Sequence, residues 1–146
     1  MSWNNQSIIE YPRQRLHRGW DYKNNVMLYD EFGIDSDGDI LKLEYDDDGD
    51  RIHRDYYNPD NIILMDYINQ KDINDNKIYV GDVIFHKNNL GIFIGVVEWI
   101  NNEYTSGYAV KWIIGNCSLP WHQFEIIGNV FENPELIGES NANKSN

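Results

Sequence analysis

The stretch MDYINQKDINDNKIYVGDVI, residues 65–84, decides the fold. Two apolar runs flank a polar segment here, and the pair Gly81-Asp82 begins the second run. Short apolar runs bounded by turn residues are typical of β-strands. The stretch therefore predicts a strand, a tight loop and a new strand, as at the beginning of a small β-barrel. None of its side chains is an obvious catalyst.

The composition indicates strands throughout the rest of the chain. The 146 residues are 41% hydrophobic and 14% aromatic, with ten Tyr and five Trp. Aromatic and β-branched residues favour strands over helices. A chain of this length buries roughly two-thirds of its surface on folding and can form a barrel with a smaller β-subdomain. We therefore predict an all-β protein.

Four regions are expected along the chain. Residues 16–60 should form a hairpin, which turns at Lys23, Asn24 and Asn25, and an acidic β-meander around two Asp-Gly turns. The later strands are short and separated by turns, and they predict an SH3-like β-barrel in the C-terminal half. The predicted regions are an N-terminal extension at 1–15, the hairpin and meander at 16–60, the barrel at 62–137 and a disordered tail at 138–146.

Three details of the strands and turns are expected in the barrel region. Gly95 within a long strand predicts a bend or bulge. The residues Asn133, Pro134 and Glu135 stand in the order of a capping residue, a first-turn proline and an acid, which predicts a single helical turn. Trp99 alternates with apolar neighbours in that long strand, as Trp112 does in the next one, and both are expected to be buried.

The net charge of −12 is concentrated in one part of the chain. Residues 30–60 hold twelve acids against three basic residues, a local net charge of −9. Phosphate-backbone binding needs clustered Lys and Arg, so nucleic acid is disfavoured as a partner. The alternative of a nucleic-acid-binding β-barrel stays open, since the region after Pro59 is not strongly acidic.

Cysteine content and hydropathy indicate the compartment. Cys117 is the single cysteine, which excludes an internal disulfide and is typical of a reducing cytoplasm. No apolar run reaches the roughly 18 residues of a membrane span, and the first residues lack the pattern of a signal peptide. We expect a cytoplasmic protein that does not contact a membrane.

The two Asp-rich turns, which begin at Asp35 and Asp46, have the acids of a calcium-binding loop but not its spacing. An EF-hand loop needs Gly at its sixth position, but counting from Asp35 places Ile40 there, and counting from Asp46 places Arg51. We therefore expect solvated hairpin turns and no bound cofactor. The functional alternative is an acidic surface that mimics nucleic acid or docks on a basic partner. Its candidate contact residues are Asp46, Asp47 and Asp48.

No catalytic residue is assigned, and we expect a protein that is not an enzyme. Cys117 and His122 are the only thiol and imidazole close in sequence, and the residues around them match no hydrolase motif. A phosphate-binding loop, a nucleophile elbow and a His-Glu metal motif are all absent from the sequence. Trp121 follows Pro120 in a predicted loop and is a further candidate contact residue.

Three blocks of the sequence follow one another over most of the chain: RGWD at 18–21 with the following Met27, KD at 71–72 with IYVGDVI at 78–84, and FEIIGNVFENPELI at 124–137. In this order the blocks resemble the YopX family of phage and prophage proteins. The resemblance implies a structural role for the matching residues, which are Arg18, Trp20, Asp21, Met27, Asp72, Tyr79, Gly81, Asp82, Gly128, Asn129, Asn133 and Pro134.

Two departures from the family pattern concern the loop in residues 65–84. Asn69 and Asp75 stand where the family usually has Gly. Both residue types tolerate positive φ, so we expect the loop geometry to be kept.

The family resemblance implies a small, mainly β phage protein without an assigned enzymatic activity. We expect a non-enzymatic accessory protein of the host cytoplasm that acts through contacts with an unidentified protein partner. Exposed edges of the meander also make a homo-oligomer an expected form of contact.

Overall fold

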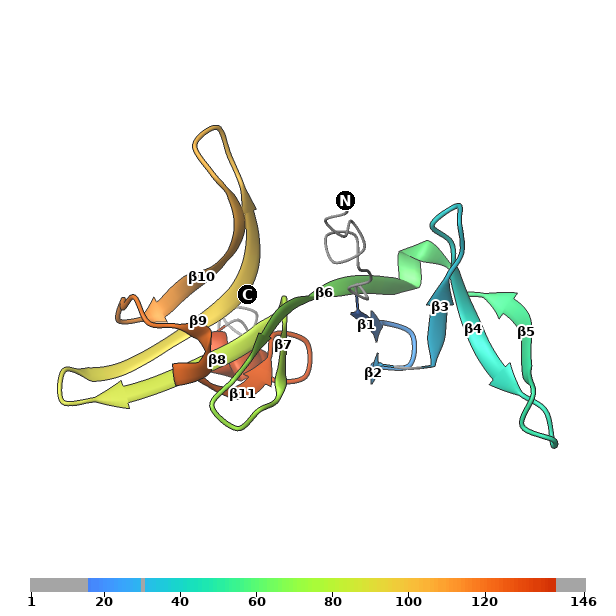
Figure 1. The fold of residues 1–146 in the computed structure, drawn as a ribbon, viewed down its shortest axis with the longest axis horizontal. Coiled ribbons are helices and arrows are strands. Elements are labelled where there is room, and N and C mark those ends of the chain that lie inside the picture. The colour runs from blue at the N-terminus through green and yellow to red at the C-terminus, as the bar shows by residue number, and fades with distance from the viewer. Residues whose placement is uncertain (1–15, 30, 139–146) are drawn as a thin grey trace, which may run out of the picture.

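The computed structural model describes residues 16–29 and 31–138 (Figure 1). Within these residues the chain forms eleven strands and three short 3₁₀ helices, which confirms the predicted all-β class. None of the described helices is long and apolar enough to cross a bilayer. The predicted extension at 1–15 and all of the tail except Gly138 lie outside the described residues.

The strands form three antiparallel sheets. The first sheet has the order β2-β1-β6-β7, from β1 (His17–Asp21), β2 (Val26–Leu28), β6 (Ile62–Lys71) and β7 (Lys77–Tyr79). The second has the order β10-β9-β8-β11, from β8 (Asp82–Asn88), β9 (Gly91–Asn101), β10 (Ser106–Ile114) and β11 (Glu125–Asn129). The third is the predicted meander, from β3 (Phe32–Ile34), β4 (Ile40–Tyr45) and β5 (Arg51–Tyr56). The 3₁₀ helices are η1 (Pro59–Asn61), η2 (Trp121–Gln123) and η3 (Pro134–Ile137).

Strand β6 belongs to both halves of the molecule. Its first half pairs with β1, with Ile62 opposite Asp21 and Asp66 opposite His17. Its second half pairs with β7, where Tyr67 lies opposite Tyr79. Figure 1 shows β6 running from the side of β1 toward the sheet of β8 to β11. The boundary expected between 60 and 62 coincides with the beginning of β6, and the independence of the two regions stays a prediction.

The second sheet is curled and contains a long hairpin made of β9 and β10. Trp99 pairs with Tyr108 and Val97 with Val110 across β9 and β10. The expected irregularity occurs on the strand opposite Gly95, because the register shifts between Trp112 and Ile114. The sheet has two ends, β10 and β11, and SH3-like closure stays a prediction.

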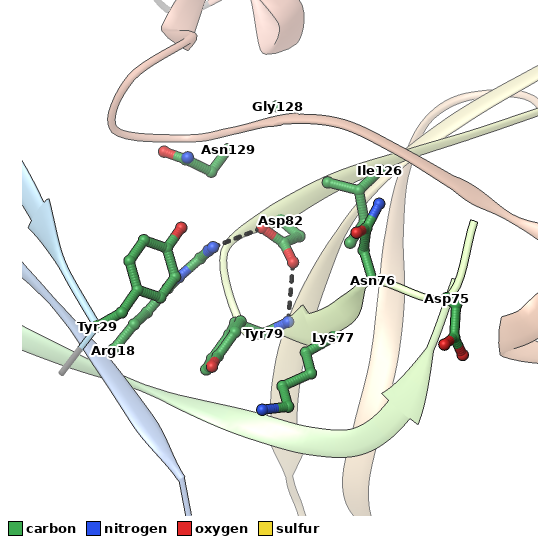
Figure 2. A pocket seen from close by; sticks show the side chains of 10 residues that line it. All are labelled: Arg18, Tyr29, Asp75, Asn76, Lys77, Tyr79, Asp82, Ile126, Gly128 and Asn129. Carbon is green, nitrogen blue, oxygen red and sulfur yellow. Dashed lines mark hydrogen bonds and ion pairs between the residues drawn. The ribbon is translucent and has the colours of Figure 1, made fainter. Parts of the chain in front are cut away.

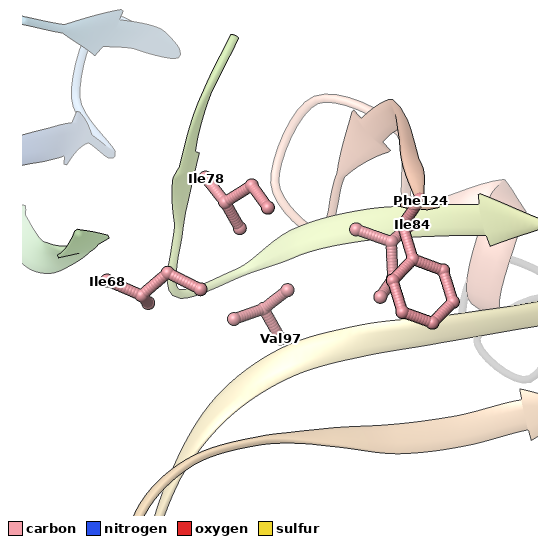
Figure 3. Packing of buried hydrophobic residues seen from close by; sticks show 5 residues of the cluster. All are labelled: Ile68, Ile78, Ile84, Val97 and Phe124. Carbon is pink, nitrogen blue, oxygen red and sulfur yellow. The ribbon is translucent and has the colours of Figure 1, made fainter. Parts of the chain in front are cut away.

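One apolar cluster joins the two larger sheets. It is made of residues from β6, β7, β8, β9 and the segment before β11, namely Ile68, Ile78, Ile84, Val97 and Phe124 (Figure 3). A second cluster on the first sheet holds Trp20, Met27 and Met65, with Phe131 packed against it. Val80 contacts both clusters. The core is therefore continuous from the N-terminal hairpin to the curled sheet.

Two of the tryptophans differ from each other in burial although both alternate with apolar neighbours. Trp112 is half-buried and packs against the first cluster. The expectation that Trp99 is buried is wrong, since it is 52% exposed. Figure 1 shows the β9–β10 hairpin extending away from the other strands, so no second layer covers that end. Trp121, the candidate contact residue, is half-buried and packs against the same cluster.

Gly95 provides a test of the curled sheet. A Cβ at this position would collide with Cγ1 of Val110 and lie 3.0 Å from the backbone oxygen of Lys111. We expect Gly95→Ala to lower the free energy of unfolding by about 1–3 kcal/mol, because a rigid neighbouring strand must move. Urea unfolding measures the effect. Gly33→Ala is the control, because its Cβ would meet only ordinary contacts at 3.5 Å or more; equal losses in the two variants would contradict the prediction.

Candidate functional site

Five polar side chains are buried among the described residues: Arg18, Asp21, Asp72, Asp82 and Asn129. All five belong to the set that the family resemblance singled out. Burying a polar or charged group costs free energy unless hydrogen bonds or an opposite charge compensate it. The partners of these side chains therefore define the most constrained part of the protein.

Arg18 and Asp82 form a buried ion pair between β1 and the beginning of β8. Arg18 Nη1 lies 2.7 Å from Asp82 Oδ1, and each side chain is 3% exposed (Figure 2). Asp82 Oδ2 accepts a hydrogen bond from the backbone N–H of Tyr79 at 2.8 Å. Arg18 Nη2 donates to the carbonyl of Val80 at 3.2 Å, and the guanidinium lies 4.9 Å from the Tyr79 ring centroid. Both charged groups are thus paired with other groups of the protein itself.

The ion pair offsets part of the cost of burying its two charges. Burial raises the pKa of the Asp82 carboxyl, and the charge of Arg18 with the N–H of Tyr79 offsets only part of that effect. Arg18 Nε is buried without a hydrogen-bond partner. An unpaired buried donor costs about 1–3 kcal/mol. The pair therefore places β1 accurately and is sensitive to the loss of either member.

The corner between β7 and β8 joins four segments of the chain through its backbone. Val80 N–H donates to the carbonyl of Asp66 in β6 at 2.9 Å. Gly81 N–H donates to Val97 in β9 at 2.8 Å, and its carbonyl accepts from Val130 after β11 at 2.9 Å. Gly81 has a φ of 94°, which a side chain would strain. A glycine is therefore required at the point where the two larger sheets meet.

The two Asp-rich turns and the β6–β7 turn have the same geometry. In each, the first Asp accepts hydrogen bonds at 2.8 to 3.0 Å from the backbone N–H groups two and four residues later. These first residues are Asp35, Asp46 and Asp72. The fourth residue of each turn has positive φ, with values of 87° at Gly38, 85° at Gly49 and 67° at Asp75. An acidic side chain thus replaces a backbone acceptor in all three turns.

This shared geometry confirms the expectation for the loop in residues 65–84. Asp75 and Asn69, which stand where the family usually has Gly, both adopt positive φ, at 67° and 64°. The β6–β7 turn also contacts the second sheet, because Asp72 Oδ2 accepts from Ile126 N–H at 3.0 Å. Asp72 therefore fixes both the turn and the position of β11.

Asn129 and Asn133 organise the segment after β11. Asn129 Oδ1 accepts from the N–H groups of Phe131 and Glu132, at 3.0 and 2.8 Å. The helical turn predicted at Pro134 is confirmed as η3, but Asn133 does not cap it through its side chain. Its Oδ1 instead accepts from Asn129 N–H at 3.2 Å. A Cβ on Gly128 would lie 2.5 Å from that oxygen, so a larger residue would displace it.

The remaining family residues lie in or beside the N-terminal hairpin. Trp20 stacks on Phe131 at a centroid distance of 5.5 Å, and Met27 packs in the same cluster. Asp21 accepts from the N–H groups of Lys23 and Asn24 in the hairpin turn. Desolvation raises the pKa of Asp21, but the hydrogen bonds from Asn24 and Lys23 outweigh it and hold this pKa below its usual value. The family residues thus support turns and contacts.

A polar surface hollow of about 530 Å³ lies beside the ion pair (Figure 2). Its lining includes five of the family residues and several exposed ones: Arg18, Tyr29, Asp75, Asn76, Lys77, Tyr79, Asp82, Ile126, Gly128 and Asn129. The buried side chains at its wall are held by the protein's own groups. Its geometry favours a structural interpretation of this region.

The other candidate residues lie at separate places. Asp46 caps its turn, whereas Asp47 and Asp48 are exposed at the tip between β4 and β5. The carboxylates of Asp35, Asp37 and Asp39 lie within 4.8 Å of one another in an exposed turn. Cys117 packs against the first cluster, and burial raises the pKa of its thiol.

One group of residues with functional interest was missed in the sequence. The Tyr108 hydroxyl donates to Asp66 at 3.0 Å, and the Tyr108 ring contacts exposed Trp99. Asp66 and Tyr108 are 42 residues apart, so spacing could not connect them. The available signal was the position of Trp99 near the end of a strand longer than its neighbours.

The fold and the buried polar groups define a class of all-β proteins in which polar side chains hold turns and sheet contacts. The chain belongs to the YopX protein family, because the model of that family matches residues 16–138. This match confirms the resemblance. No curated protein matches the chain. The crystal structure of protein EF1440 from Enterococcus faecalis is similar, with a TM-score of 0.58 and 16% identity over 86% of this chain and 99% of that chain. At this identity the likeness concerns the fold alone.

The ion pair predicts a pH-dependent loss of stability. In Arg18→Met, Asp82 stays buried without its partner, and we expect about 3–5 kcal/mol less stability at pH 7.5. Because the pKa of Asp82 is raised in the folded state, ionisation of Asp82 lowers the stability of the fold. This loss is absent below the pKa of the unfolded chain, near 3.8, and is complete above the pKa of the folded state. The loss in Arg18→Met should therefore be smaller at pH 5 than at pH 7.5, as urea unfolding would measure.

Lys23→Met provides the control for this experiment. It removes an equal charge from the same hairpin, but the Lys23 side chain is exposed. A loss in Arg18→Met that matches the control, or that is identical at both pH values, would contradict the proposed energetics of the pair.

Proposed function

We propose that this protein is a non-enzymatic accessory protein of phage or prophage origin that acts in the bacterial cytoplasm through protein–protein contacts. The observation that carries this proposal is the meander sheet of β3, β4 and β5. Figure 1 shows it at one end of the molecule, away from the curled sheet. Membership of the YopX family supports the phage origin that the resemblance implied.

The meander combines exposed aromatic side chains with an excess of acids. Tyr45 is 61% exposed and Tyr56 47%. A three-stranded sheet gains stability from a covered apolar face, and exposed large apolar side chains mark contact surfaces. The net charge of −9 between residues 30 and 60 favours a partner with a basic surface.

The chemistry of the buried groups supports a role other than catalysis. Arg18 and Asp82 form an ion pair with each other, and Asp72 and Asp82 accept hydrogen bonds from backbone N–H groups. Burial raises the pKa of Cys117, which favours the unreactive thiol over the nucleophilic thiolate.

The acidic tip of the meander can be tested against a matched surface. We expect Asp47→Asn with Asp48→Asn to reduce capture of the partner in an affinity pull-down from phage-infected host cells, because two exposed charges are lost. The control is Glu103→Gln with Glu135→Gln, which removes two exposed acids outside the meander. Equal capture by the wild type and the meander variant would contradict the proposed surface.

A homo-oligomer through the meander edges is a second form of this proposal. The edge strands are β3 and β5, and Ile34 on β3 is exposed. Because the meander is acidic, self-association should increase when salt screens the repulsion. Size-exclusion light scattering at micromolar concentration should show a mass above the monomer in high salt. Ile34→Glu, which adds a charge and removes an exposed apolar side chain at the edge, should reduce that mass, while Ile92→Glu outside the meander should not. Only monomer under all conditions would contradict the oligomer.

A further inference from the structure

A second hollow, of about 450 Å³, lies between β6 and the β9–β10 hairpin. We call it the Trp99 groove, and it is lined by Leu16, Asp66, Tyr67, Asn69, Trp99 and Tyr108. It belongs to the two larger sheets and not to the meander. None of the residues that line it belongs to the family set or to the five buried polar residues.

Aromatic rings form one wall of the Trp99 groove. Trp99 is half exposed, and its ring meets the edge of Tyr108 at a centroid distance of 5.0 Å and an interplanar angle of 70°. Tyr108 also packs against the apolar cluster of the core. The exposed indole is therefore held against a partner that the core keeps in place, and it presents a rigid surface.

A positioned carboxylate forms the other side. Asp66 accepts a hydrogen bond from the Tyr108 hydroxyl at 3.0 Å, and His17 Nε2 lies 3.1 Å from its other oxygen. The Asp66 side chain is nevertheless 50% exposed, so it can accept further hydrogen bonds. Among the residues that the structure describes, 16–29 and 31–138, it is the only charged one in the lining of the groove.

The charge of the groove selects among possible occupants. An anionic ligand would face the Asp66 carboxylate, and an apolar segment would remove water from it without replacing its hydrogen bonds. A cation satisfies both walls, because it can pair with Asp66 and lie on the ring face of Trp99.

We propose that the Trp99 groove binds a basic segment of a partner protein, with an arginine side chain between Trp99 and Asp66. Arginine fits better than lysine, because its planar guanidinium stacks on an indole and can pair with a carboxylate through two hydrogen bonds. The net charge of −12 attracts such a segment from a distance. The inference rests on the proposed function in that the ligand is part of a protein, but it uses a different surface from the meander.

Isothermal titration calorimetry of the full chain tests the proposal. The ligand is a peptide of alternating arginine and glycine whose two ends are capped and uncharged. A matched peptide with citrulline in place of arginine keeps the shape and loses the charge. We expect binding of the arginine peptide at low salt and at least about tenfold weaker binding of the citrulline peptide, since a cation–π contact and an ion pair are both lost.

Variants locate the binding. Trp99→Ala and Asp66→Asn should each weaken binding of the arginine peptide by about three- to tenfold or more, as expected for the loss of roughly 1 kcal/mol. Asp47→Asn is the matched control, because it removes one exposed charge from the meander and should leave the affinity unchanged. Trp99→Phe keeps an aromatic ring and should bind with intermediate affinity, which separates a loss of contact from a loss of folding.

Four results would overturn the proposal. Arginine and citrulline peptides could bind equally, or Asp47→Asn could weaken binding as much as Asp66→Asn, which would indicate general attraction to an acidic protein. A lower mass of Trp99→Ala than of the wild type in light scattering would identify a second copy of the chain as the occupant. If the wild type does not bind the arginine peptide but the meander variant still loses partner capture, the proposed function is retained and only this groove is removed.

Discussion

The fold depends on a buried ion pair between the N-terminal hairpin and the first strand of the curled sheet. Arg18 comes from β1 and Asp82 begins β8, and neither charge can lose its partner without leaving the other unpaired in a dry environment. The backbone of Val80 and Gly81 adds hydrogen bonds to β6, β9 and the segment after β11 at the same place. The ion pair and these backbone hydrogen bonds together place the two larger sheets against each other.

The acidity of the chain has two physical origins. Asp35, Asp46 and Asp72 are acceptors within turns, where a carboxylate closes the backbone at the first position. Other acids, including Asp47 and Asp48, are exposed at a turn tip and contribute charge to the surface. Composition alone cannot separate these groups, but a shared turn pattern does.

The two proposed contact surfaces lie on different parts of the molecule and differ in chemistry. The meander offers exposed tyrosines and a high density of acids. The Trp99 groove offers one carboxylate beside an aromatic wall, which suits a single side chain. An acidic sheet that attracts a basic partner and a groove that binds one of its side chains would act together, because long-range attraction speeds encounter and close contacts provide specificity.

The sequence by itself determined the all-β class, the N-terminal hairpin and the three strands of the meander, because alternation and turn residues act over short distances. The family resemblance indicated twelve residues with a structural role, and the five buried polar residues are among them. Only the tertiary structure decided that β6 is shared between two halves, that Asn133 bonds Asn129 instead of capping a helix, and that Trp99 is exposed. Alternation shows which side chains share a face of a strand. Whether another layer covers that face depends on how distant segments pack, which is why the groove between Asp66 and Trp99 emerged only from the fold.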